Sequence, residues 1–177
     1  VAPVGGSDDH RAGADVSAPN APIGTPTTMV YAEELSHAGI VEGIRTGRTV
    51  VRVLGAASPM VELGADRAIE GDTVKAASTR LSATVRGARG MQAVWVKNGV
   101  QGELVELDRD EQELVLEVRA PATGQDRYRI EVFQDGQRRT VTSHLWVETG
   151  PAGPGGSGGV GPGGGGRRPG GGVGRAP

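Results

Sequence analysis

The residues best suited to chemistry stand within the first dozen positions, in the stretch V-G-G-S-D-D-H-R-A-G from Val4 to Gly13. Divalent metal ions are commonly bound by carboxylate oxygen and imidazole nitrogen. In an extended or looped backbone, Asp8 and His10 can turn both side chains toward one cavity and form half of a metal site. The preceding Gly5 and Gly6 allow a tight turn at the end of a strand. Taken alone, the same pattern is compatible with a polar terminal loop.

The other reactive side chains do not complete a catalytic set. His37 follows a predicted helix cap and His144 lies in a predicted strand, so we expect a structural or surface role for each. Glu33 and Glu34 are adjacent and point apart, which favours a surface or capping role over acid–base catalysis. No paired histidine and acid accompany the candidate nucleophiles Ser7, Ser36 and Ser143, so a serine hydrolase is not indicated.

Composition narrows the classes of function. The chain has 177 residues and no cysteine, which excludes disulfides and thiolate metal sites but leaves the compartment open. A net charge of -2 gives no field strong enough to favour nucleic acid or an anionic membrane as partner. No apolar run approaches the roughly 20 residues of a membrane helix, and the start lacks the features of a signal peptide. We expect a soluble protein of undetermined compartment and oligomeric state.

A short amphipathic helix is predicted after a proline-rich irregular stretch, residues 13–28. Ser36 is the expected N-cap and Gly47 the C-terminal stop. Gly39 and Gly43 each lower the helix propensity by roughly 1 kcal/mol relative to alanine, so the helix needs a partner surface. Its apolar face contains Ile40, Val41 and Ile44.

From Thr49 to Glu148 the hydrophobic period changes to two, which predicts roughly seven short strands and an antiparallel immunoglobulin-like sandwich. Asn98-Gly99 is a strong signal for a two-residue hairpin turn. The pattern Asp126-x-Tyr128 is similar to the tyrosine corner of such sandwiches. The expected strands are Thr49 to Leu54, Met60 to Leu63, Leu81 to Val85, Met91 to Lys97, Leu104 to Leu107, Leu114 to Val118, Tyr128 to Phe133 and Thr140 to Val147.

The alternation of side chains also predicts the core. Successive residues of a strand point to opposite faces, so only one of Val94 and Trp95, and one of Leu145 and Trp146, faces inward. The other expected core residues are Leu114, Leu116, Tyr128, Ile130 and Val132. Residues 150–177 are almost entirely glycine and proline with three arginines and offer too little apolar surface to order, which predicts a disordered tail.

The order of these motifs resembles the C-terminal end of the polymerase and histidinol phosphatase (PHP) metallohydrolases, in their CehA/McbA-like branch. The resemblance covers Gly5 to about Glu148. It is carried by G-G-S-D-D-H, by P-I-G-T-P-T-T-M-V-Y-A-E-E-L-S, by a helix ending I-R-T-G-R, and by I-E-G-D-T-V and V-K-N-G. In that family an S-D-x-H motif ends a strand of a distorted β/α barrel, a helix follows, and a β-sandwich often comes next.

The resemblance implies a mainly β fold in three parts. Residues 1–48 would be the last strand and helix of the barrel, residues 49–149 the immunoglobulin-like sandwich, and residues 150–177 the disordered tail. Asp8 and His10 would be metal ligands, with Asp9 at the variable position between them. The parent protein would use divalent ions such as Zn, Mn or Fe to hydrolyse a small-molecule ester or phosphoester.

Departures from the family pattern qualify that expectation. The family builds its site from several histidine and acidic motifs, beginning with an H-x-H that this chain lacks. A catalytic zinc site needs at least three protein ligands, so we expect this chain alone to be inactive. The chain begins with valine inside a motif, which predicts a fragment. The alternatives are a stand-alone immunoglobulin-like binding module and a structural spacer.

Overall fold

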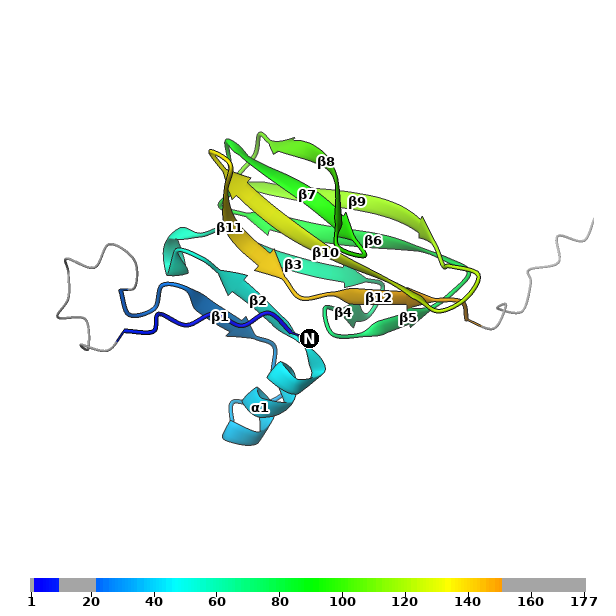
Figure 1. Ribbon diagram of the computed structural model, residues 1–177, viewed down its shortest axis with the longest axis horizontal. Coiled ribbons are helices and arrows are strands. Elements are labelled where there is room, and N and C mark those ends of the chain that lie inside the picture. Colours follow the sequence, from blue (N-terminus) through cyan, green and yellow to red (C-terminus); the bar gives the residue numbers. More distant parts are fainter. Residues whose placement is uncertain (1, 10–21, 151–177) are drawn as a thin grey trace, which may run out of the picture.

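The computed structural model describes residues 2–9 and 22–150, which fold into two packed β-sheets with one helix at their side (Figure 1). The larger sheet contains β1 (Thr27–Val30), β2 (Thr49–Arg52), β5 (Thr73–Lys75), β7 (Met91–Lys97), β8 (Val100–Leu107), β10 (Gln125–Gln134), β11 (Gln137–Thr142) and β12 (Leu145–Glu148). The smaller sheet contains β3 (Met60–Ala65), β4 (Ala68–Ile69), β6 (Ser78–Arg86) and β9 (Glu111–Arg119). The helices are α1 (His37–Thr46) and a short 3-10 turn (Gly55–Ala57). The fold is therefore mainly β, as predicted.

Strand β10 organises the larger sheet. One of its edges pairs with β7, and β11 and β12 share the other edge. The sequence predicts one strand from Thr140 to Val147, and this prediction is wrong, because Ser143 and His144 interrupt it and separate β11 from β12. Pairing is antiparallel throughout both sheets except between β12 and β5, which run parallel.

The core between the sheets confirms most of the predicted residues. Tyr128, Ile130 and Val132 of β10 are buried together with Leu114 of β9, and Leu145, not Trp146, faces inward. Leu116 is only partly buried and packs against this cluster. The alternating pattern therefore located the core correctly along the strands that it identified.

Strand β7 buries both of its faces. Trp95 packs against the core between the sheets. Val94 points to the outer side of the larger sheet, where its cross-strand neighbour is Glu131, yet it is only 1% exposed. Burial of Val94 thus requires long polar side chains that fold over the outer face of the sheet.

The Asn98-Gly99 turn is confirmed as the hairpin between β7 and β8, with positive φ at both residues. The tyrosine corner differs from the expected form, because the hydroxyl of Tyr128 donates to the carboxylate of Asp126, at 3.4 Å, and not to the backbone. Lys97 and Asn98 also bind this carboxylate, each at 2.7 Å. These interactions hold the pKa of Asp126 below its usual value and fasten the hairpin turn to the start of β10.

Helix α1 begins and ends as predicted, and it packs through its glycine face while its apolar face stays exposed, as expected for this chain alone. The amide of Gly39 donates to the Ser36 hydroxyl at 3.0 Å, and Gly47 takes the left-handed conformation. Gly43 is the buried residue of the helix, and a Cβ there would lie 2.6 Å from the carbonyl oxygen of Tyr31. This glycine lets the helix approach the chain that follows β1, while the apolar face turns away.

The segments assigned by resemblance to a barrel and to a sandwich share one sheet. β1 pairs with β2 from Val30 to Thr27, and β2 pairs with β11 in the larger sheet. The sequence predicts irregular structure up to Thr28, whereas β1 already begins at Thr27. No helix in the part that the structure describes is long and apolar enough to cross a membrane. The predicted disordered tail lies outside the described residues, apart from Gly150.

Candidate functional site

The segment that carries the S-D-D-H motif is fixed beside β1. The amide of Gly5 donates to the hydroxyl of Thr28 at 2.8 Å, and that hydroxyl donates back to the Gly5 carbonyl at 2.9 Å. The hydroxyl of Thr49 donates to the carbonyl of Pro3 at 2.8 Å. Asp8 follows as an exposed residue with φ 53. The backbone just before the motif is therefore fixed by hydrogen bonds to Thr28 and Thr49.

The predicted metal half-site is described only in part. Asp8 offers a carboxylate suited to a divalent cation, but His10 lies outside the described residues. Among residues 2–9 and 22–150, no group of three or more His, Asp or Glu side chains is close enough together to hold a metal. The described donors do not fit a metal ion by themselves, so the ligand roles of Asp8 and His10 remain predictions.

The other two histidines lie apart from that motif. His37 is the exposed first residue of α1. His144 stands in the break between β11 and β12, half-buried, with its ring 5.7 Å from that of Trp146. Burial and the charges of Arg129 and Arg127 lower the pKa of His144 to about 4. Its imidazole is therefore neutral at physiological pH.

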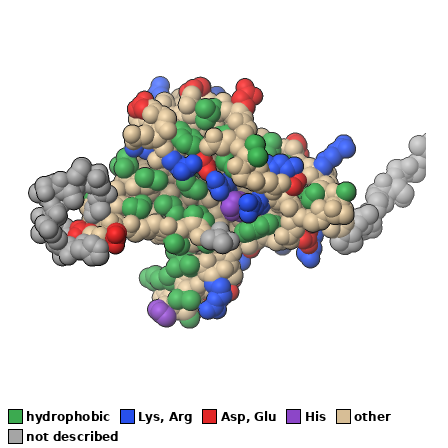
Figure 2. All heavy atoms as spheres, viewed as in Figure 1, with side chains coloured by type: hydrophobic (Ala, Val, Ile, Leu, Met, Phe, Trp, Pro, Cys, Tyr) green, Lys and Arg blue, Asp and Glu red, His purple; other side chains and the backbone are tan. Residues whose placement is uncertain are grey.

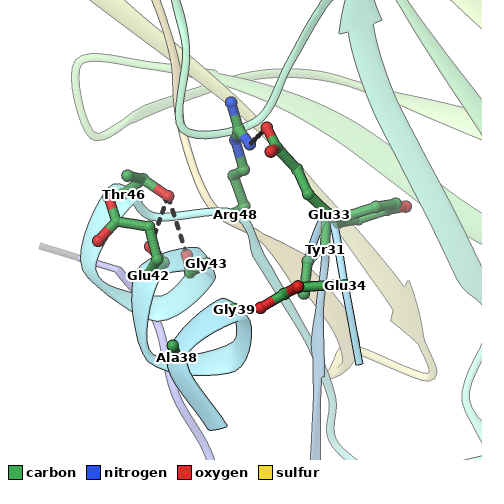
Figure 3. A pocket seen from close by; sticks show the side chains of 10 residues that line it. Tyr31, Glu33, Glu34, Ala38, Gly39, Glu42, Gly43, Thr46 and Arg48 are labelled. Carbon is green, nitrogen blue, oxygen red and sulfur yellow. Dashed lines mark hydrogen bonds and ion pairs between the residues drawn. The ribbon is translucent and has the colours of Figure 1, made fainter. Parts of the chain in front are cut away.

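A hollow of about 420 Å³ lies between α1 and the segment that precedes it (Figure 3). Its carboxylates are those of Glu33, Glu34 and Glu42, and the Tyr31 ring points away from the helix. The carboxylate of Glu33 lies 3.8 Å from Arg48, and that of Glu42 lies 3.3 Å from Arg45. The carboxylate of Glu34 accepts a hydrogen bond from the Ser36 hydroxyl at 2.5 Å. Since each carboxylate has a different partner, they do not converge as an acid–base pair would.

Arg48 joins this hollow to the sandwich. Its guanidinium lies 3.2 Å from the carboxylate of Asp72, in the turn between β4 and β5, and 3.8 Å from Glu33. At the same junction Gly71 has φ 96, and a Cβ there would lie 2.6 Å from the carbonyl oxygen of Thr46. The end of α1 and the turn at Gly71 are therefore in backbone contact, which leaves no room for a side chain.

Two buried polar groups that sequence reasoning missed lie next to this junction. Glu70 is 1% exposed, and within the described part of the chain its Oε1 atom has no hydrogen-bond partner; the same holds for the Tyr31 hydroxyl. Burial raises the pKa of Glu70 to about 7, with smaller contributions from the charges of Glu62 and Asp72. Burial and the charge of Glu70 also raise the pKa of Tyr31. Nothing in the local sequence I-E-G-D distinguishes this glutamate from an exposed one.

A third missed group is Glu131, on the outer face of the larger sheet, where charges of both signs gather (Figure 2). Its carboxylate binds Arg129 and, at 3.0 Å, Arg138, and it accepts from Gln101 at 3.2 Å. Burial alone would raise the pKa of Glu131, but the two arginines outweigh it and the pKa is lowered. These side chains lie over the face on which Val94 is buried.

Comparison with known proteins adds little to this geometry. No family model matches the sequence, and no curated protein matches it. The CARDB domain of a Pyrococcus furiosus protein, solved in solution by NMR, aligns with 51% of this chain and 96% of its own, at 13% identity and a TM-score of 0.37. A likeness this distant carries no argument about function, which must come from the residues themselves.

Proposed function

We propose that this chain is the C-terminal portion of a metal-dependent hydrolase of the PHP superfamily, acting on a small-molecule ester or phosphoester. In this proposal residues 1–48 are the last strand and helix of the barrel, and residues 49–149 are an appended sandwich of immunoglobulin-like type. Asp8 and His10 supply two metal ligands. The proposal rests on the resemblance of the motifs and on one structural observation.

That observation is the uncovered apolar face of α1. Leu35 is 97% exposed, and the helix residues on the same surface are each more than one-third exposed: Ile40, Val41 and Ile44. Figure 2 shows hydrophobic side chains gathered on the part of the surface formed by α1. No element among the described residues covers this face, and an apolar helix face usually packs against a partner. A barrel beside the helix would bury it and would bring further ligands to the S-D-D-H segment.

The remaining metal ligands must then come from other parts of the protein. The described donors do not fit a metal ion, and His10 adds at most one imidazole, so we expect the purified chain to show no metal-dependent phosphoesterase turnover. Turnover by this chain alone would contradict the proposal.

The decisive experiment uses the protein encoded together with the sequence upstream of Val1. We expect an H-x-H motif there and metal-dependent hydrolysis of a chromogenic phosphoester. Asp8→Asn and His10→Asn should each lower kcat/KM by about a hundredfold, because a metal ligand is lost. Asp9→Asn is the matched control, since it removes an equal charge at the variable position. If Asp9→Asn lowers turnover as much as the other two variants, the assignment of ligands is wrong.

A second prediction concerns the face of α1. Because this face is exposed, the purified chain should bind a hydrophobic fluorescent dye, and Ile40→Gln with Ile44→Gln should remove a large part of that fluorescence. Both side chains are exposed, so the free energy of unfolding should change by less than about 0.5 kcal/mol. Equal dye fluorescence from the wild type and the double variant would show that the helix face is not accessible.

A further inference from the structure

Buried polar atoms without partners gather at the junction between the end of α1 and the sandwich. Within the described part of the chain, five buried side-chain nitrogen or oxygen atoms have no hydrogen-bond partner. Four of the five belong to residues of this junction: the Tyr31 hydroxyl, Nε of Arg48, Oε1 of Glu70 and Oγ of Ser143. Such atoms give up hydrogen bonds to water on folding and regain them when the structure around them opens. Separation of the junction would therefore restore hydrogen bonds that the closed form lacks.

These four residues come from four different connections that meet at one place. The connections are those between β1 and α1 (Tyr31), between α1 and β2 (Arg48), between β4 and β5 (Glu70), and between β11 and β12 (Ser143). The amide of Tyr31 donates to the Arg48 carbonyl at 3.0 Å. A Cβ on Gly71 would lie 2.9 Å from Cγ of Arg48, and a Cβ on Gly47 would lie 3.3 Å from Oγ of Ser143. The junction is therefore tightly packed but poor in hydrogen bonds.

Glu70 makes the junction sensitive to pH. Its side chain is 1% exposed. Burial, the largest cause, raises its pKa to about 7 against the lowering effect of backbone amides, and the acidic neighbours Glu62 of β3 and Asp72 of the same turn add to the rise. The ring of Tyr31 points away from α1 (Figure 3), and the pKa of its hydroxyl is raised by burial and then by the charge of Glu70. The carboxyl of Glu70 is therefore surrounded by groups that disfavour its ionised form.

The basic residues nearby are paired with other carboxylates. Arg48 lies 3.2 Å from Asp72, and Arg86 lies 2.8 Å from Glu62. Among the described residues neither arginine forms an ion pair with Glu70. A buried charge without a partner is strongly disfavoured. Ionised Glu70 is therefore better accommodated in water than in the closed junction.

We propose that the junction is a pH-dependent latch: protonated Glu70 keeps the α1 segment, residues 31–48, closed on the sandwich, and ionised Glu70 makes it separate more readily. The contact that opens is the one between Gly71 and the Thr46 carbonyl, and opening exposes the other unpartnered atoms to water as well. His144, whose carbonyl accepts from the Gly71 amide at 2.8 Å, has a pKa of about 4 and stays neutral near pH 7. This inference is independent of the proposed hydrolase function.

The test uses one introduced cysteine as a reporter, because the chain has none of its own. Ser143→Cys places a thiol at a fully buried position of the junction, and the measured quantity is its labelling rate by a disulfide reagent divided by that of an exposed thiol. This ratio should rise about tenfold per pH unit between about pH 5 and about 7 and then level off. Glu70→Gln in the same background should abolish the rise, because glutamine cannot ionise. Glu42→Gln, at an exposed position of α1, is the matched control and should leave the rise unchanged.

Hydrogen exchange on the unsubstituted chain separates local opening from global unfolding and does not depend on the cysteine. At every pH the amide of Gly71 should be at least about tenfold less protected than the amides in the middle of β10, because the junction opens without unfolding of the sheet. Equal protection would show that the junction opens only when the whole sandwich unfolds, and would overturn the proposal. So would a labelling ratio that does not rise with pH, or a rise that persists in the Glu70→Gln variant.

Discussion

Replacing Glu70 with glutamine should raise the free energy of unfolding by about 3 kcal/mol above pH 7 and leave it nearly unchanged below pH 4.5. The pKa of this buried carboxyl rises from 4.5 to about 7 on folding, so between these values the native state holds a proton that the unfolded state has released. Stability is therefore lost as the pH rises through this window. Glutamine has nearly the same shape as the protonated acid and cannot ionise.

His144 contributes in the opposite direction over part of the same window. Its pKa falls from 6.5 to about 4 on folding, so the unfolded state binds the extra proton, and stability is lost as the pH falls. The pH profile of the wild type alone mixes the two effects. The measurement is therefore the difference between Glu70→Gln and wild type, from urea unfolding at several pH values.

A matched control separates burial from charge. Glu117 is exposed on β9, so Glu117→Gln removes an equal charge without removing a buried carboxyl. If the difference between Glu70→Gln and wild type does not change between pH 4.5 and about 7, the carboxyl of Glu70 is not protonated in the folded protein near neutral pH.

Gly71→Ala should be the most damaging alanine substitution at the junction, with a loss of roughly 3 kcal/mol in the free energy of unfolding. Part of the loss is the strain of a side chain at φ 96, and the rest comes from a Cβ placed 2.6 Å from the Thr46 carbonyl oxygen. The Thr46 carbonyl and the Cα atom of residue 71 both belong to the backbone, so neither can move aside without separating α1 from the turn between β4 and β5.

Gly99→Ala is the control for strain alone. Gly99 has a similar φ of 90, but nothing lies within 4 Å of a Cβ there. We expect this variant to lose about 1 kcal/mol. Equal losses for the two variants in chemical denaturation would mean that the close contact between Gly71 and Thr46 does not contribute to stability.

Local signals made much of the fold predictable. Ser36 and Gly47 are the predicted ends of α1, and Asn98-Gly99 forms the predicted hairpin turn. Both predictions succeeded because capping and turn geometry depend on residues close in sequence. Alternation identified the inward face of β10 for the same reason. None of these signals needed knowledge of distant partners.

Long-range pairing escaped prediction. The break at Ser143 and His144 exists because β11 and β12 share an edge of β10 while β11 also pairs with β2 and β12 with β5, a set of partners that no local pattern encodes. The burial of Glu70 and Glu131 was missed for a related reason, since each is covered by residues from other elements. The assignment of Asp8 and His10 remains a prediction from resemblance, and its test lies in the longer protein.

The pairing of β2 with β11 also affects the order in which the protein assembles. The hairpins β7–β8 and β10–β11 join strands that are adjacent in sequence. By contrast, β2 pairs with β11, which lies near the far end of the described chain, so this contact closes a long loop. Synthesis proceeds from the N-terminus, so α1, β1 and β2 leave the ribosome well before β11 exists. During that interval β2 has its pairing with β1 but not yet its pairing with β11. The larger sheet is therefore completed on the β2 side only when β11 has been made.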